Sequence, residues 1–135
     1  MVDGITGQLG LIRTLRGLTP EFGSFDDEQF NEVEFERHLD SNPHLANPAC
    51  RYWIRKLQAR FYAGDDASAL VAADKAERLL WAMPPSVEVP DYHFYGALAR
   101  AKHLPCRIDR RANPALESTR GAPQAARGLG KELHR

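Results

Sequence analysis

The stretch that decides the fold is NPACRYWIRKLQARFYAGDDASALVAADKAERLLWAM, residues 47–83. Its first half carries apolar side chains at helical spacing: Cys50, Trp53, Ile54, Leu57 and Phe61. The basic residues of this half are expected to lie off that stripe: Arg51, Arg55, Lys56 and Arg60. Gly64 follows as a helix stop, and Asp65 or Asp66 can cap a second helix. The stretch therefore predicts two helices joined by a tight turn.

The second half of the stretch continues the helical pattern with small side chains. Its apolar positions are Ala69, Val71–Ala73, Ala76, Leu79–Leu80 and Met83. Small residues let two helices approach closely, while large residues fill the groove between them. The alanines are therefore predicted to mark the contact between the two helices.

A further helix is predicted before this pair, over residues 1–16. It carries apolar side chains at a helical period: Ile5, Leu9, Ile12 and Leu15. Three glycines recur at every third position of the same segment: Gly4, Gly7 and Gly10. Each interior glycine costs about 0.5–1 kcal/mol relative to alanine. Their shared face therefore indicates the close approach of a neighbouring helix, within this chain or outside it.

Residues 17–27 are predicted to form a connector, because Thr-Pro and Gly-Ser steps interrupt any helical period. Phe22 and Phe25 are expected to attach this connector to the core. Asp26 or Asp27 is predicted to cap the helix that follows, whose acidic residues suit the positive end of the helix dipole.

Prolines predict the boundaries of the remaining helices. Asn42-Pro43 ends the acidic helix, and Asn47-Pro48 is expected to supply the N-cap and the first residue of the next one. After Pro84-Pro85, Ser86 is predicted to cap a last helix that runs to about Ala101. Its inward residues are expected to be Val89, Tyr92, Phe94, Tyr95, Leu98 and Ala101. The predicted fold class is all-α, with about five helices.

The composition changes near residue 101. All of the Phe, Tyr and Trp residues lie between Phe22 and Tyr95. Residues 1–101 hold 10 Lys/Arg and 15 Asp/Glu, a net charge of −5, whereas residues 102–135 hold 8 and 3, a net charge of +5. A basic tail can bind nucleic acid or an anionic membrane. This one has no aromatic residue to stack on a base and no dense basic cluster, which favours a solvated, disordered tail.

Part of the helix pair resembles the tetratricopeptide repeat (TPR). That motif places a Trp sixteen residues before a small residue, and a second small residue seven further on. Trp53, Ala69 and Ala76 have these spacings, and Gly64-Asp65 occupies the turn. The sequence departs from the motif at three places. Lys56-Leu57 replaces a Leu-Gly step, Arg60 replaces an aromatic residue, and the closing proline, Pro84, comes late. The resemblance implies antiparallel helix pairs of TPR-like type.

Longer runs carry a second resemblance: GQLGLIRTLRGLTP (residues 7–20), FGSFDD (22–27), YWIRKLQARF (52–61) and YHFYGALARA (92–101). They resemble the helical region of large bacterial sensor kinases. Such chains join a serine/threonine-kinase-like domain, an ATPase domain, this helical stretch, a GAF sensor domain and a histidine kinase. The resemblance implies that the partners are neighbouring domains of a parent-type kinase or a second copy.

The sequence departs from this family pattern at Lys102. Further amphipathic helices are replaced there by Pro-, Arg-, Gly- and Ala-rich sequence. An out-of-frame reading of a GC-rich gene is favoured for residues 102–135 over a natural disordered tail. The predicted organisation is therefore a helical repeat-like segment, residues 1–101, followed by a basic tail of low hydrophobicity.

Nucleotide and metal motifs are weighed and rejected. A phosphate-binding loop needs Gly, four residues, then Gly-Lys-Ser/Thr, whereas Ala125 and Glu132 stand at the first and last of these positions around Gly130-Lys131. The five histidines never pair at i, i+4 with a carboxylate between them: His38, His44, His93, His103 and His134. His93 is expected to be interior or half-buried between aromatic residues.

The remaining reactive residues also favour structural roles. Asp26-Asp27 and Asp65-Asp66 fit helix starts better than acid–base catalysis. Cys50 and Cys106 form neither a metal spacing nor a disulfide framework, and Cys50 is expected to be reduced and buried. No catalytic, cofactor-binding or metal-binding residue is therefore predicted, no cofactor is expected, and the chain is not expected to be an enzyme.

The predicted function is that of a non-catalytic helical scaffold or interaction segment of a signal-transduction multikinase, shortened from a longer protein. The alternative is a small peptide-binding helix-repeat adaptor with a groove lined by Trp53, Tyr62 and Tyr92–Tyr95 and rimmed by Arg51, Arg55 and Arg60. No apolar run approaches the roughly 20 residues needed to cross a bilayer, and no signal peptide is recognised. Protein partners in the cytoplasm are expected, with no nucleic acid and no membrane.

Overall fold

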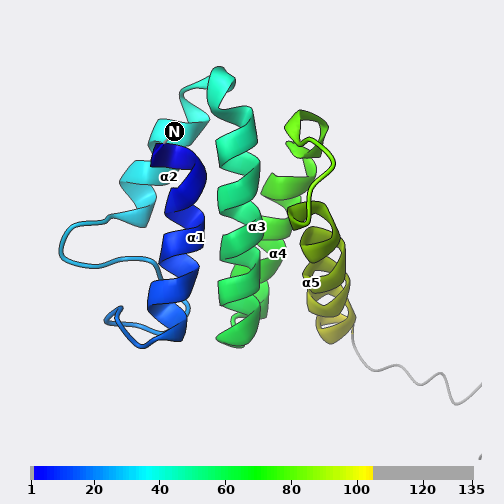
Figure 1. The fold of residues 1–135 in the computed structure, drawn as a ribbon. Helices are drawn as coiled ribbons and strands as arrows, with labels where there is room; N and C mark the ends of the chain where they lie inside the picture. Colours follow the sequence, from blue (N-terminus) through cyan, green and yellow to red (C-terminus); the bar gives the residue numbers. More distant parts are fainter. Residues whose placement is uncertain (1, 105–135) are drawn as a thin grey trace, which may run out of the picture. The chain divides into compact units, whose positions relative to one another are not determined.

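The computed structural model describes residues 2–104, and all regular structure in this part is helical (Figure 1). Its α-helices are α1 Val2–Leu15, α2 Glu32–Asp40, α3 Ala46–Tyr62, α4 Asp66–Glu77 and α5 Glu88–His103. Two 3₁₀ turns, η1 Pro43–Leu45 and η2 Leu80–Ala82, precede α3 and follow α4. The prediction of an all-α fold with about five helices is confirmed for this part. Residues 105–135, most of the predicted tail, lie outside it, and the boundary at residue 101 stays a prediction.

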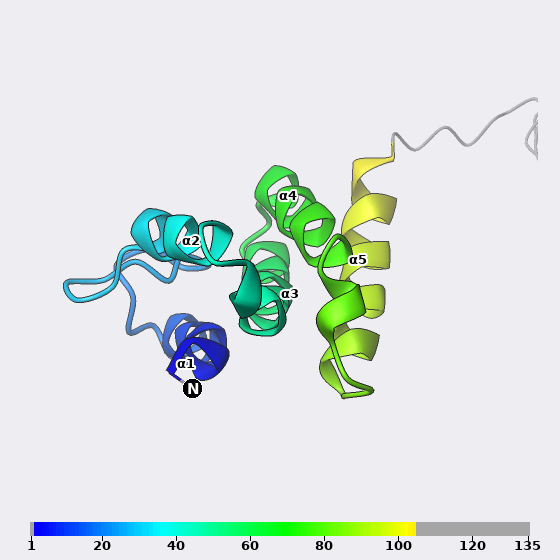
Figure 2. The ribbon, with the colours of Figure 1, turned by 90° about the horizontal axis from the view of Figure 1, so that it is seen from above.

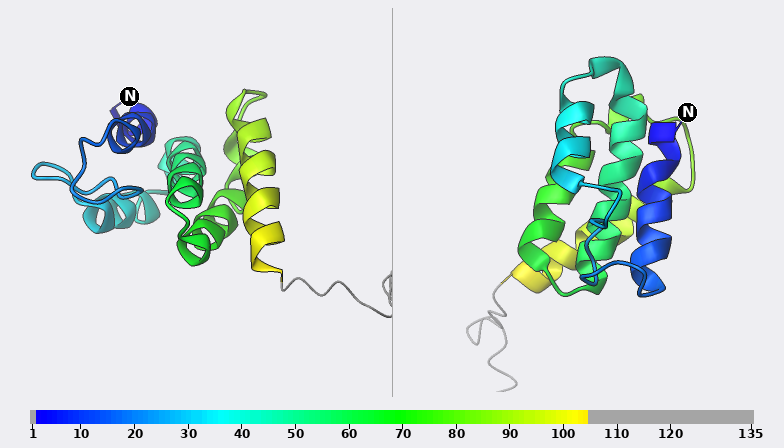
Figure 3. Two further views of the ribbon diagram at one scale, coloured as in Figure 1. Left: turned by 90° about the horizontal axis from the view of Figure 1, so that it is seen from below. Right: turned by 90° about the vertical axis from the view of Figure 1, so that its left-hand side faces the viewer.

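α1 to α4 lie in two layers, and successive helices run in opposite directions (Figure 1). α1 and α3 belong to one layer and α2 and α4 to the other, while α5 runs across the end beside both α3 and α4 (Figure 2). α3 packs against each of the other four helices. α1 and α5 stand on opposite sides of α3 (Figure 3).

Because α3 has neighbours on most sides, its buried surface extends beyond the predicted stripe. Cys50, Trp53, Ile54 and Leu57 are buried as predicted, and Phe61 is partly buried. Four further residues of α3 are buried as well: Ala49, Tyr52, Lys56 and Ala59. Lys56, which was expected only to lie off the apolar stripe, is buried because α2 covers that side of the helix.

The turn between α3 and α4 is built as the sequence predicts. Gly64 has a φ of +76°, the left-handed conformation that glycine adopts most readily. Its N–H donates to the Phe61 carbonyl at 3.1 Å, and the Asp65 N–H donates to the Arg60 carbonyl at 3.0 Å. This pair of hydrogen bonds is the Schellman motif that ends a helix. The Asp65 carboxylate then accepts the Ser68 N–H at 3.1 Å and caps α4.

The buried residues of the second helix of this pair are all alanines. Ala69, Ala72, Ala73 and Ala76 are fully buried. Val71 was predicted to join them, but 58% of its surface is exposed. The buried alanines lie three and four residues apart on one side of α4, and Val71 falls on the other side.

Two of the predicted helix starts are wrong. The N-cap of α2 is Asn31, whose side chain accepts the Glu34 N–H, rather than Asp26 or Asp27. α3 begins at Ala46, directly after the η1 turn, so Asn47 already lies inside the helix. The Asn47 side-chain amide donates instead to the Ala82 carbonyl at 3.0 Å and ties α3 to η2.

Glycines allow α1 and the connector to pack closely. A Cβ atom on Gly7 would lie 2.9 Å from the Tyr52 Cα, so the neighbouring helix predicted from the glycines is α3 of the same chain. A Cβ atom on Gly10 would lie 2.7 Å from the ring of Phe25, which belongs to the connector. Gly4 has no such neighbour within 4 Å. Phe25 is buried as expected, whereas Phe22 is half exposed.

We expect Gly7→Ala to destabilise the fold and Gly4→Ala to leave it unchanged or slightly more stable. The added methyl group at residue 7 meets the backbone of α3, and overpacking of this kind typically costs about 1–3 kcal/mol. Alanine at residue 4 meets open space and raises helix propensity by up to about 1 kcal/mol. Urea unfolding followed by circular dichroism measures both, and equal stabilities of the two variants would contradict the close α1–α3 contact.

Candidate functional site

A buried charged cluster joins α2 to α3. Only 6% of the Glu32 side chain is exposed, and its Oε1 accepts the Phe25 N–H at 2.8 Å. Its Oε2 accepts a hydrogen bond from Arg60 at 2.9 Å and lies 3.8 Å from the Lys56 ammonium. A single carboxylate thus fixes the connector, α2 and α3 to one another. Because buried charges are tolerated only when they are paired, these contacts identify a structural cluster.

Glu36, four residues further along α2, completes this cluster. Its Oε1 accepts the Tyr52 hydroxyl at 2.9 Å and also pairs with the Lys56 ammonium. Burial raises the pKa of the Tyr52 phenol, and the charges of Glu36 and Glu32 raise it further, so the phenol stays protonated and donates. Two carboxylates balance two cations in this cluster, which leaves no excess charge to attract an ionic ligand.

The aromatic residues predicted to line a peptide groove lie in separate places. Trp53 and Tyr92 are buried, with 4% and 3% of their surfaces exposed, and two lysine ammonium groups lie about 5 Å from the Trp53 ring. Tyr62 and Tyr95 pair nearer the surface, where their hydroxyl oxygens are 2.5 Å apart. A buried Trp53 and a separate tyrosine pair do not form one groove, which counts against the peptide-binding adaptor.

The arginines predicted to rim that groove form ion pairs within the fold. Arg51 lies 3.7 Å from Glu88, and Arg55 lies 2.9 Å from Asp91, so both join α3 to the first turn of α5. Arg60 belongs to the buried cluster with Glu32. These three side chains hold helices together. Arg51 and Arg55 also line one pocket beside α1, and Arg60 is not part of its lining.

The described histidines lie at the surface. His38, His44, His93 and His103 are all exposed. His93 was expected to be interior or half-buried, but it stands beside the ring of Tyr92, with ring centroids 5.0 Å apart, on the solvent side of α5. His134, Cys106 and Gly130-Lys131 lie outside the described residues.

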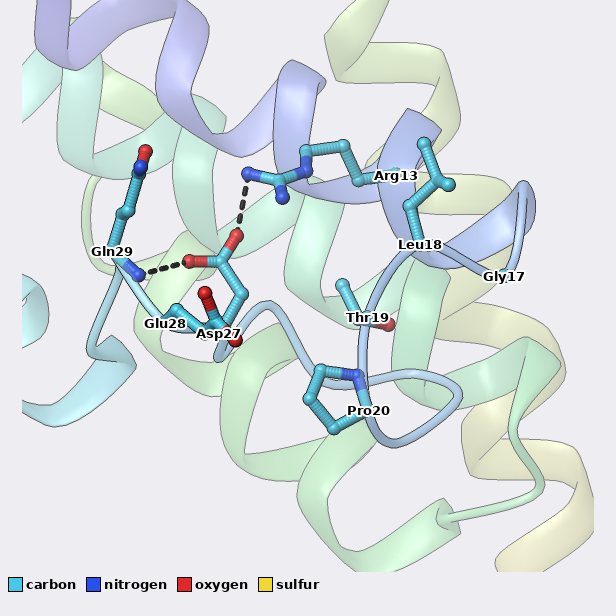
Figure 4. A pocket seen from close by; sticks show the side chains of 8 residues that line it. All are labelled: Arg13, Gly17, Leu18, Thr19, Pro20, Asp27, Glu28 and Gln29. Carbon is cyan, nitrogen blue, oxygen red and sulfur yellow. Dashed lines mark hydrogen bonds and ion pairs between the residues drawn. The ribbon is translucent and has the colours of Figure 1, made fainter.

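Figure 4 shows a polar pocket of about 360 Å³ between the end of α1 and the connector. Inside it the Asp27 carboxylate accepts the N–H groups of Gln29 and Phe30 at 2.7 and 2.8 Å and pairs with Arg13 at 2.5 Å. The hydrogen bond from Gln29, followed by that from Phe30 and the charge of Arg13, holds the pKa of Asp27 below its ordinary value. Asp26 accepts the Glu32 N–H. Both acids thus organise the connector rather than capping α2, the helix start for which they were predicted.

α5 presents its larger apolar residues to solvent. Its buried residues are Tyr92, Gly96 and Ala99, whose small members let the helix pack closely on its neighbours. Phe94, Leu98 and Ala101 were predicted to face inward, and all three are exposed; for Phe94 the exposed fraction is 59%. We call the exposed apolar stripe the α5 end face, and it consists of Val87, Pro90, Phe94, Ala97, Leu98 and Ala101.

α1, on the opposite side of α3, also exposes apolar residues to solvent. Its inner side buries Gly7, Leu11 and Thr14. Its outer side exposes three apolar residues, which we call the α1 end face: Ile5, Leu9 and Ile12. Each of the two outermost helices is therefore apolar on the side turned away from α3. Exposed apolar patches on a folded surface typically mark interaction sites, so the two end faces are the candidate functional site.

Residues 2–104 contain no group of three or more His, Cys, Asp and Glu side chains placed to hold a metal ion. Within the same residues, no helix combines the length and the apolar character required to span a membrane. Comparisons with protein-family models, curated proteins and solved structures give no match for this chain. The end faces and the charged cluster are therefore interpreted from the chemistry of the chain itself.

We expect Glu32→Ala to lower the free energy of unfolding by about 3–5 kcal/mol, because it leaves the Arg60 charge and the Phe25 N–H buried without their partner and removes one of the two carboxylates beside Lys56. Glu34→Ala is the matched control, since the Glu34 side chain is exposed on the same helix, and its effect is expected to stay within about 0.5 kcal/mol. Urea unfolding measures both variants. Equal stabilities would show that the cluster does not hold α2 to α3.

We expect Cys50 to resist thiol reagents until the chain unfolds. Burial raises the pKa of its thiol to about 11, and the thiol donates to the Ala76 carbonyl at 3.5 Å. An unfolded thiol ionises near pH 8.5, so this group favours the unfolded chain increasingly as pH rises from about 8.5 toward 11. Labelling of a Cys106→Ser variant at pH 8, with and without urea, tests this, and rapid labelling of the native chain would contradict the burial.

Proposed function

We propose that this chain is a non-catalytic helical scaffold segment, and that its end faces pack against further helices of a bacterial signal-transduction multikinase. The observation that carries this proposal is the pair of apolar end faces on α1 and α5. In a helix-repeat array each unit buries its faces against its neighbours, and a terminal unit needs a polar outer face to stay soluble. Neither α1 nor α5 has such a face, which fits an internal piece of a longer array.

The arrangement of α3 and α4 supports a TPR-like repeat type for this array. Trp53, Ala69 and Ala76 have the spacing of that motif, and all three are buried in the core. The alternation of α1 to α4 between two layers also fits stacked helix pairs. The connector between α1 and α2, which is longer than a repeat turn, departs from the regular pattern.

As a scaffold, the segment would transmit a displacement of α1 to α5 through α3. The α1 backbone lies against Tyr52 of α3 at Gly7, and Arg55 of α3 is ion-paired with Asp91 of α5. A shift of a domain attached beyond α1 would therefore reach α5 through one helix. Such a relay would act in the cytoplasm, between the ATPase domain and the sensor and kinase domains of the parent protein.

The test is binding of the full chain to a purified helical region from a multikinase of the resembled class, measured by isothermal titration calorimetry. We expect saturable binding that Leu9→Glu weakens at least about tenfold, because it places a charge on the α1 end face. Val71→Glu is the matched control: Val71 is as exposed as Leu9 but lies on α4, away from both end faces. Absence of binding, or equal losses in the two variants, would contradict the proposal.

A further inference from the structure

The α5 end face runs along the whole helix. Its residues recur at intervals of three and four, on the side opposite Tyr92, Gly96 and Ala99. α5 has 16 residues and is therefore about 24 Å long. Apolar residues with this spacing are typical of a helix that packs along another helix. Ala97 and Ala101 are small, so the backbone of a partner helix can approach closely.

Two opposite charges flank this stripe, one near each end. Asp91 and Lys102 are separated by about three helical turns, so they project from the same side of α5. Their side chains stay 38% and 50% exposed, although Asp91 pairs with Arg55 and Lys102 lies 4.0 Å from Asp66. A second α5 helix packed antiparallel along the first would bring Lys102 of the second copy to Asp91 of the first, and Asp91 of the second copy to Lys102 of the first.

The same register also matches the apolar residues. When Asp91 of one copy meets Lys102 of the other, the midpoint of the contact falls between Gly96 and Ala97. Phe94 of each copy then lies one residue away from the position that faces Leu98 of the other, close enough for the two side chains to pack, and the two Ala97 residues meet near the centre. Every contact occurs twice, which is the property of an isologous, self-complementary interface.

We propose that two copies of this chain associate through their α5 end faces, packed antiparallel about a two-fold axis near Ala97. The proposal rests on the proposed function, which treats the α5 end face as a docking surface, and it names a second copy as the occupant. A contact between two single helices is smaller than the roughly 800 Å² per partner of a standard interface. The dimer is therefore weak, and its population rises with concentration.

The α1 end face is a poorer partner for α5 than a second α5. Residues 4–16 contain no acidic residue, so α1 offers no carboxylate to Lys102 over this range. A contact from α1 of one copy to α5 of the next would also repeat without closing and give open filaments. Pairing of two α5 helices adds an opposite charge beside Asp91 and beside Lys102, next to their partners within the chain, and it closes after two copies.

The first test is sedimentation equilibrium of the full chain from about 10 µM to 1 mM. We expect a monomer–dimer equilibrium whose dissociation constant rises at least about tenfold in Phe94→Glu, since that change places a charge at the centre of the interface. Val71→Glu is the matched control, with an exposed fraction close to that of Phe94, and it is expected to leave the equilibrium unchanged. Circular dichroism of both variants establishes that they fold.

The charge pairs provide a second test. Lys102→Glu places carboxylates opposite each other at both ends of the contact and is expected to weaken the dimer about tenfold. The double variant Asp91→Lys with Lys102→Glu restores opposite charges across the axis and is expected to recover most of the loss. Failure of the second substitution to recover association overturns the antiparallel register.

A cross-link tests the position of the axis. In a Cys106→Ser background, Ala97→Cys places a thiol beside the axis, so mild oxidation is expected to give a covalent dimer. Ala67→Cys, an exposed position on α4, is the control and is expected to stay monomeric. A chain that is monomeric at every concentration, or a dimer that the Ala97→Cys thiol does not cross-link, overturns the proposal.

The outcomes separate this proposal from the proposed function. Dimer formation is measured on the chain alone and is lost in Phe94→Glu, whereas binding of the kinase region is lost in Leu9→Glu. Assemblies that grow with concentration and disappear in Leu9→Glu indicate a head-to-tail contact and overturn the two-fold dimer, while they leave the docking role of the end faces intact.

Discussion

The burial of Tyr52 within α3 is the constraint on which the N-terminal half of the described structure depends. Its backbone lies against Gly7 of α1, and its ring contacts Phe25 of the connector and Phe35 of α2, with centroid distances of 5.8 and 5.1 Å. Its hydroxyl reaches Glu36. A large aromatic side chain buried on all sides fixes every element that touches it, because there is no free volume in which those elements can shift.

This central position of α3 also explains why the candidate interaction surfaces lie on the outermost helices. α3 buries most of its circumference, and α4 contributes alanines to the same core. α1 packs on α3, and α5 packs on α3 and α4, while the other sides of both helices carry exposed apolar residues. The proposed scaffold role and the proposed two-fold contact both follow from this arrangement, since packed helices transmit position and exposed apolar helix faces favour association.

Local signals in the sequence predicted the features that depend on neighbouring residues, but not those that depend on distant ones. The stop at Gly64 and the cap at Asp65 follow from short-range hydrogen bonds. The burial of Lys56 depends on carboxylates 20 and 24 residues away, which no helical period reveals. The inward side of α5 was predicted only in part: Tyr92 is buried and Tyr95 packs against the core, whereas Phe94 is exposed. The helix is apolar on two sides, and hydrophobicity alone favours Phe94 over Gly96. The small residues Gly96 and Ala99 are the signal that identifies its packed side, as the alanines do in α4.

The described helices are expected to form one cooperative unit around α3 while their end faces remain open. A thermal melt of residues 1–104 beside the full chain, followed by circular dichroism at low micromolar concentration, measures this cooperativity. We expect equal helical signals per molecule and a single cooperative transition with the same midpoint in both. A weak, non-cooperative loss of helix in residues 1–104 would contradict it and would mean that α3 cannot hold its neighbours without further parts of the protein.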